Sequence, residues 1–124
     1  MTTTVKSFRD LRIWQTAMDL VQLVYELVRS LPREERFVLG DQMRRAAISI
    51  PANIAEGHSR RHTREYLQHL AIARGSLAEL LTLALIAEQL GYATREAVTA
   101  IELRVQDLRM PLSTLVARLE EKAL

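Results

Sequence analysis

The sequence predicts an all-α protein folded as an antiparallel up-down-up-down four-helix bundle. Ala, Leu, Glu, Arg and Gln dominate the composition, whereas the 124 residues include only four glycines and three prolines, a balance typical of helical proteins. Apolar residues recur in alternating steps of three and four along four long segments, which is the helical period. The connections are short, so successive helices should be antiparallel neighbours.

The first two predicted helices are bounded by a capping pattern and a proline. Ser7, with Asp10 three residues later, resembles a capping box, so the first helix should begin near Ser7. It should run to about Leu31, where Pro32 stops it. The second helix follows this turn and should run to about His58.

The last two predicted helices have threonine caps. Thr63 should cap the third helix, which runs to about Leu90 and stops at Gly91. Thr94 should cap the fourth, which continues almost to the end of the chain. One apolar seam with an opposite charged face makes the fourth an outer helix.

Two prolines lie inside predicted helices, Pro51 in the second and Pro111 in the fourth. Proline has no N–H, and the ring of Pro51 crowds the carbonyl of Ala47, so we expect a kink at each proline. At Pro51 an outright break into two helices remains an alternative.

The length predicts a single bundle domain over residues 7–124, preceded by a flexible tail at residues 1–6. The absence of cysteine excludes disulfides and thiolate chemistry. The N-terminus has no signal-peptide apolar core, and no uninterrupted apolar run approaches the roughly 18 residues of a membrane span. We therefore expect a cytoplasmic protein without a membrane partner.

The first and third helices each carry two apolar seams, which is more than a helix packed only in its own bundle needs. Self-association would cover the second seam, since large apolar patches are rare on monomers. A wide internal core that uses both seams is the alternative. In the third helix, Gly75 and Ser76 should allow close approach of a neighbouring helix. In the first helix, the first seam is Leu11, Trp14, Met18, Val21, Tyr25 and Val28, and the second is Ile13, Ala17, Leu20, Val24, Leu27 and Leu31. In the third helix, the first seam is Tyr66, Leu70, Ala73, Leu77, Leu80, Ala84 and Ala87, and the second is Leu67, Ala71, Ala78, Leu81 and Leu85.

Residues with catalytic or metal-binding chemistry form no known pattern. No Gly-rich phosphate loop or nucleophile motif is present. His58 and His62 are four residues apart but straddle a predicted turn among arginines, and His69 should lie at a helix surface. Glu56 and Glu79 could face each other between antiparallel helices, but pairing with an arginine is the simpler expectation. We therefore predict no enzyme, no metal site and no cofactor.

A polar stripe follows one face of the second helix. Its members are Gln42, Arg45, Ser49, Asn53 and Glu56, in steps of three, four, four and three. One interpretation is a buried hydrogen-bond network that satisfies the carbonyl freed by Pro51 and fixes helix register. The other is a face for an interface or ligand. Gly57 follows this stripe and should help to end the helix.

Arginine supplies 15 of the 17 cationic residues and concentrates around the second turn. From residue 44 to residue 74, six arginines face two glutamates, a balance of +4 in a chain whose net charge is +2. One interpretation is an ordinary solvated turn. The other is a surface that contacts nucleic-acid phosphates in a salt-dependent manner with little sequence preference. The candidate contacts are Arg44, Arg45, Arg60, Arg61, Arg64 and Arg74.

Several strings make the chain resemble the 23S rRNA intervening-sequence (S23-type) proteins. The most specific is SIPANIAEG at residues 49–57, which includes Ser49, Pro51, Asn53, Glu56 and Gly57. FRDLRIWQ at 8–15, LP at 31–32, ERF at 35–37, QMRRAAI at 42–48, ARGSLAEL at 73–80 and LGY at 90–92 occur in the family's order.

This resemblance implies a four-helix bundle that assembles as a ring-shaped homopentamer. Some family members are encoded within insertions in 23S rRNA genes. A related branch is the accessory protein of diversity-generating retroelements, a basic pentamer that binds nucleic acid and its reverse transcriptase. The resemblance therefore implies a non-enzymatic nucleic-acid-binding protein, or alternatively an interaction scaffold for a partner such as a reverse transcriptase.

Overall fold

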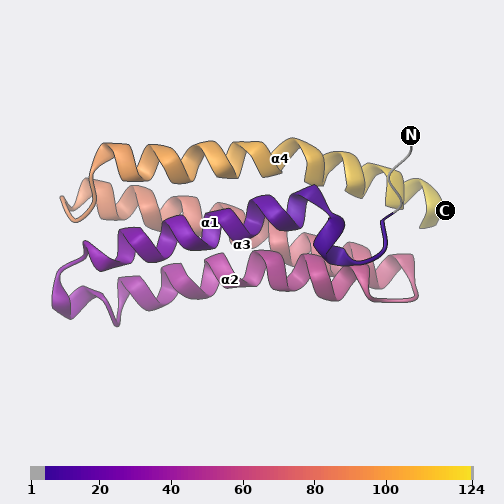
Figure 1. Cartoon of the computed structure of the whole chain (residues 1–124), viewed down its shortest axis with the longest axis horizontal. Coiled ribbons are helices and arrows are strands. Elements are labelled where there is room, and N and C mark those ends of the chain that lie inside the picture. Colours follow the sequence, from indigo (N-terminus) through magenta and orange to yellow (C-terminus); the bar gives the residue numbers. More distant parts are fainter. Residues whose placement is uncertain (1–4, 124) are drawn as a thin grey trace.

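The computed structural model describes residues 5–123, so most of the expected tail at residues 1–6 lies outside the described part. Within this range four α-helices form an antiparallel bundle (Figure 1). Helix α1 packs against α2 and α4, and α3 packs against the same two helices. The predicted class and topology are confirmed. The helices are α1 (Arg12–Arg29), α2 (Leu39–His58), α3 (Thr63–Gln89) and α4 (Arg95–Ala123).

The capping box at Ser7 is confirmed, but it caps the short 3-10 helix η1 (Phe8–Asp10) rather than α1. Leu11, at φ −73° and ψ 126°, is extended and separates η1 from α1. The predicted start of the first helix is therefore wrong. The Asp10 carboxylate accepts the N–H groups of Lys6 and Ser7, which closes a single turn before the chain can propagate a longer helix. A second 3-10 helix, η2 (Arg33–Glu35), precedes α2.

The remaining boundaries follow the expected chemistry with one exception. Gly91 adopts φ +77°, the left-handed conformation that ends α3. Thr94 Oγ1 accepts the N–H of Ala97 at 3.2 Å and so caps α4 as predicted. Thr63 was expected to cap α3, but it is the first helical residue, and the N-cap is His62 with no side-chain cap bond.

Helices α1 and α3 each bury one of their two apolar seams in the core. The second seam of α1, from Ile13 to Leu31, is buried, whereas its first seam leaves Met18 and Tyr25 exposed. In α3 the seam from Leu70 to Ala87 is buried, while Leu85 of the other seam is exposed. Val28 of the first seam is nevertheless buried in the core, and Leu11, Trp14, Val21, Leu67 and Leu81 pack against it, so the bundle itself covers part of the second surface. Self-association over the remaining exposed residues stays a prediction.

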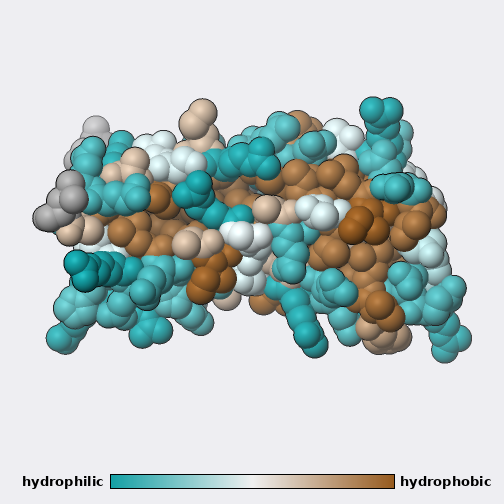
Figure 2. All heavy atoms as spheres, turned by 180° about the vertical axis from the view of Figure 1, so that it is seen from behind, coloured by the Kyte–Doolittle hydropathy of each residue, from teal (hydrophilic) through white to brown (hydrophobic). Residues whose placement is uncertain are grey.

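The outward side of α3 is unusually apolar. Figure 2, seen from behind the view of Figure 1, shows apolar surface along the side where α3 lies, and Ile72, Leu85 and Ile86 are exposed there. By length and composition α3 would be able to cross a membrane, although no such segment is expected from the runs of apolar residues in the sequence. In the bundle, 39% of its most apolar window is buried, so α3 is a partly buried core helix.

Both internal prolines lie within unbroken helices. Helix α2 continues through Pro51, and α4 continues through Pro111. The alternative of two separate helices at Pro51 is wrong, because packing of α2 against α1 and α3 outweighs the one backbone bond that proline removes. The kinks expected at the two prolines stay predictions.

Gly57 and Gly75 do not have the roles expected from the sequence. Gly57 does not end α2; it is buried where α3 crosses closely, and a Cβ built on it would lie 2.8 Å from His69 Cβ and 2.8 Å from Tyr66 Cδ1. Gly75 was expected to admit a neighbouring helix, yet a Cβ there would meet nothing within 4 Å. Gly57 therefore permits close packing of α2 on α3, as Gly40 does on α1, where a Cβ would lie 2.9 Å from Val28 Cγ1.

Alanine substitutions should separate these roles. Gly57→Ala should lower the free energy of unfolding by about 1–3 kcal/mol, since overpacking against Tyr66 and His69 outweighs the better helix propensity of alanine. Gly75→Ala, the matched control, should raise it by about 0.5–1 kcal/mol. Urea denaturation measures both. Equal effects of the two substitutions would contradict the packing role of Gly57.

Candidate nucleic-acid interface

A polar network joins α2 to α3 beside the close approach at Gly57. Asn53 Nδ2 donates to the Ser49 carbonyl at 2.8 Å and lies 3.1 Å from Ser49 Oγ. Ser76 Oγ of α3 donates to Ser49 Oγ at 2.9 Å. Asn53 Oδ1 is 2.9 Å from His69 Nδ1, also in α3. These contacts fix the register of the two helices.

The network also determines the tautomer of His69. The Asn53 amide nitrogen donates to a carbonyl, so its Oδ1 is the acceptor, and His69 Nδ1 must carry the proton. His69 was expected at a helix surface, but only 18% of its side chain is exposed. Glu56 Oε2 lies 3.6 Å from the same Nδ1, so Glu56 faces His69 rather than Glu79.

The polar stripe of α2 therefore divides into two parts. Ser49, Asn53 and Glu56 contact polar groups of α3, while Gln42 and Arg45 are exposed. The amide of Asn53 serves the Ser49 carbonyl, so the expectation that this network satisfies the carbonyl freed by Pro51 is wrong.

Three of the candidate arginines lie together at one end of the bundle. Arg60 and Arg61 occupy the turn between α2 and α3, and Arg64 lies in the first turn of α3. All three are exposed. Arg60 Nε lies 3.9 Å from Glu65 Oε2, whereas Arg61 and Arg64 make no ion pair with any residue from 5 to 123. This turn therefore presents net positive charge to solvent.

Arg44 does not belong to this cluster. It lies near the start of α2, roughly 20 Å along the axis from Arg60 at about 1.5 Å per residue. Its guanidinium pairs with Asp41, donates to the Arg36 carbonyl at 2.9 Å and lies 6.0 Å from the ring centroid of Tyr25. Arg44 is therefore held in place apart from the turn, and its role as a phosphate contact stays a prediction.

Arg45 and Arg74 also lie apart from the turn. Arg45 is exposed along α2. Arg74 lines a surface groove of about 460 Å³ between α3 and α4, together with Arg109 and the small residues Ala71 and Gly75. The structure thus separates the six predicted arginines into one cluster of three and three individual sites.

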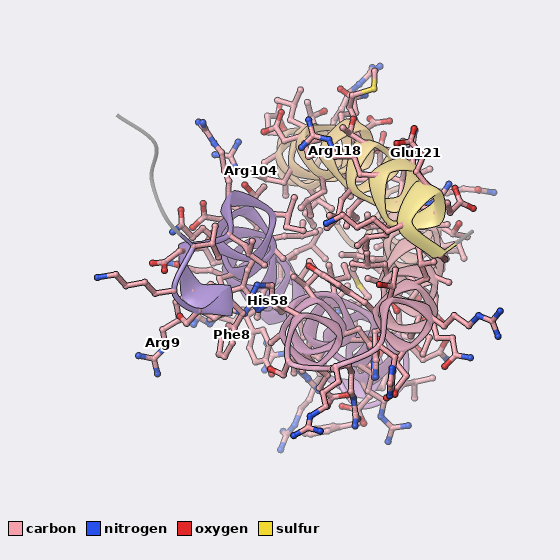
Figure 3. All side chains as sticks on the ribbon, turned by 90° about the vertical axis from the view of Figure 1, so that its right-hand side faces the viewer. Phe8, Arg9, His58, Arg104, Arg118 and Glu121 are labelled. Atoms are coloured by element: carbon pink, nitrogen blue, oxygen red, sulfur yellow. The ribbon has the colours of Figure 1, made fainter. Side chains whose placement is uncertain are left out.

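Two further arginines at the same end, Arg9 and Arg118, carry no signal in the sequence. Arg9 of η1 and Arg118 near the end of α4 come from distant parts of the chain, and Figure 3 shows both at the bundle end that carries His58. The up-down topology brings both to this end of the bundle, Arg9 on η1 beside α2 and Arg118 on α4. We call Arg9, Arg60, Arg61, Arg64 and Arg118 the basic end.

The described residues show no catalytic constellation. No group of three or more His, Cys, Asp or Glu side chains from this part of the chain could hold a metal ion. His58 packs edge-to-face on Tyr66, with ring centroids 6.0 Å apart, so it is part of the helix contact rather than a ligand pair with His62. The geometry instead offers exposed guanidinium groups, whose chemistry suits phosphate.

Tyr66, which packs on Gly57, gives the fold a dependence on alkaline pH. Burial raises the pKa of Tyr66 above its ordinary value of 10.0. Its contribution to stability is therefore complete below pH 10 and is lost as the pH rises through the folded-state pKa. The free energy of unfolding should fall more steeply above pH 10 in the wild type than in Tyr66→Phe. Parallel pH profiles would contradict this prediction.

Comparison with known proteins identifies the family. No curated protein matches the sequence. The fold is similar to a crystal structure of a protein of unknown function from the S23 ribosomal protein family of Bacteroides thetaiotaomicron VPI-5482, with a TM-score of 0.77 and 21% identity over 84% of this chain and 97% of that chain. The family model described as 23S rRNA-intervening sequence protein matches residues 9–114. The chain therefore belongs to the 23S rRNA-intervening sequence protein family.

Proposed function

We propose that this protein is a non-enzymatic, cytoplasmic homo-oligomer whose basic end binds the phosphates of RNA or DNA with little sequence preference. The observation that carries the proposal is the exposed arginine cluster of the α2–α3 turn, in which Arg61 and Arg64 have no ion-pair partner among residues 5–123. Arg9 and Arg118 add two further arginines at the same end, beside the carboxylates of Asp10 and Glu121.

Phosphate binding at the basic end would break few existing contacts. The Arg60–Glu65 pair is long at 3.9 Å and both side chains are more than 40% exposed, so the pair contributes little to stability. Arginine also makes bidentate contacts with phosphate oxygens. These contacts are made with the sugar–phosphate backbone of the nucleic acid and not with its bases, which explains the expected lack of sequence preference.

The exposed apolar seams of α1 and α3 support self-association. Helices α1 and α3 lie diagonally across the bundle, because each packs against α2 and α4, so their outer seams face opposite sides. A contact that joins two unlike surfaces is head-to-tail and closes into a ring when the rotation permits. The resemblance to the family sets the expected number at five. A ring would repeat the basic end around one axis and strengthen its field.

A protein-interaction scaffold is the second candidate function. The exposed seam of α3 would equally suit a partner protein, and an accessory subunit for an enzyme such as a reverse transcriptase would use it in this way. Binding of such a partner without any binding of nucleic acid would favour this alternative.

The nucleic-acid proposal predicts a steep dependence of binding on salt. For the wild type, the logarithm of the association constant for generic duplex DNA should fall linearly with the logarithm of salt concentration. Arg61→Gln and Arg64→Gln should each make this slope shallower by about 0.9. Arg95→Gln, an exposed arginine at the opposite end, is the control and should leave the slope unchanged. No binding at low salt, or a flat response, would refute the proposal.

The oligomer proposal predicts that charge on the outer seam dissociates the assembly. Met18→Glu places a carboxylate on the exposed seam of α1, where Met18 is 44% exposed, and should yield monomers. Met110→Glu, at a more exposed position on α4, should leave the assembly intact. Size exclusion with light scattering measures both. A wild-type monomer at micromolar concentration would contradict self-association.

A further inference from the structure

A small cavity beside the basic end combines an aromatic ring, a cation and hydrogen-bond acceptors. It has a volume of about 320 Å³ and is lined by Phe8, Ala55, Glu56, Ser59 and Arg60. Phe8 is distant in sequence from the other four residues, so no sequence pattern indicates this site. The topology alone places an aromatic ring next to a phosphate-binding arginine.

Contacts within the protein hold the ring of Phe8 in place. The capping box of Ser7 and Asp10 closes η1. Trp14 packs edge-to-face on Phe8, with ring centroids 5.3 Å apart and an interplanar angle of 65°. Phe8 stays partly exposed in spite of this contact. A fixed, partly exposed aromatic face provides a stacking surface for a base without a large loss of side-chain entropy.

The polar residues of the cavity are two hydrogen-bond acceptors, Glu56 and Ser59, beside the cation of Arg60. Ser59 Oγ donates its proton to the Ala55 carbonyl at 2.9 Å, so only lone pairs remain for a ligand. The Glu56 side chain is 60% exposed and adds a carboxylate acceptor, of which Oε2 lies 3.6 Å from His69 Nδ1. A base with adjacent N–H donors complements this set, and guanine, with N1–H and N2–H on its Watson–Crick edge, complements it best.

We propose that this cavity is a nucleobase subsite that makes the protein prefer single-stranded RNA or DNA, with guanine favoured. The base stacks on Phe8, its N–H groups donate to Glu56 and Ser59, and the adjoining phosphate contacts Arg60. Bases in a duplex are paired and stacked, so they cannot enter the cavity, whereas unpaired bases can. This inference rests on the proposed function, since it adds a base contact to the phosphate contacts.

The test compares binding of a short single-stranded RNA with that of the same sequence in a duplex. The wild type should bind the single strand roughly tenfold more tightly. Phe8→Leu should abolish this preference while leaving duplex binding and its salt dependence unchanged. Phe37→Leu is the matched control, because Phe37 is the other phenylalanine of the chain, is 74% exposed and lies at the opposite end. Thermal denaturation should show that both variants are folded.

Two further readouts do not depend on the Phe8 variant. Trp14 is the only tryptophan and contacts Phe8, so its fluorescence should change on binding a single strand and not on binding a duplex. Glu56→Gln should remove the preference for guanine-containing over uracil-only single strands.

Several outcomes would overturn the inference. Equal affinity of the wild type for single strand and duplex would refute the subsite while leaving phosphate binding intact. An unchanged preference in Phe8→Leu would do the same. Absence of binding to any nucleic acid would refute both the subsite and the proposed function.

Discussion

The contact between α2 and α3 is the constraint on which the rest of the structure depends. Gly57 has no side chain, so α3 can approach until Tyr66 and His69 occupy the space of a Cβ. At this distance Ser49 and Asn53 reach Ser76 and His69, and the hydrogen bonds allow one register only. Unsatisfied partners would be costly at any other register. Within residues 5–123 no buried side-chain nitrogen or oxygen lacks a partner.

The same contact determines the position of the basic end. The turn from Ser59 to His62 is short, so the register of α2 and α3 fixes where Arg60 and Arg61 lie relative to η1. A helix that frayed at Gly57 would release this turn and separate Arg60 from Phe8. The SIPANIAEG motif at residues 49–57 thus holds α2 against α3. The arginines of the turn that follows it supply the proposed contacts with phosphate. Met18 and Tyr25 of α1 and Leu85 of α3 remain exposed outside this contact and are available for the proposed self-association.

Helices and their ends were largely predictable because they depend on local chemistry. Periodicity located all four helices, the positive φ of Gly91 follows from its position after a long apolar segment, and the hydroxyl of Thr94 caps α4. The features that were not predictable depend on tertiary contacts. Arg44 lies over the ring of Tyr25 in α1, and His69 is drawn into the network by Asn53. The approach of Phe8 to Arg60 joins segments whose proximity only the topology determines.

A double-mutant cycle between Asn53 and His69 tests the central claim most directly. The free energy of unfolding is measured for the wild type, Asn53→Ala, His69→Ala and the double variant. If the network fixes the register of α2 and α3, the two losses should be strongly non-additive, with a coupling energy of about 1–2 kcal/mol. A coupling energy near zero would show that the two side chains act independently and would contradict the claim.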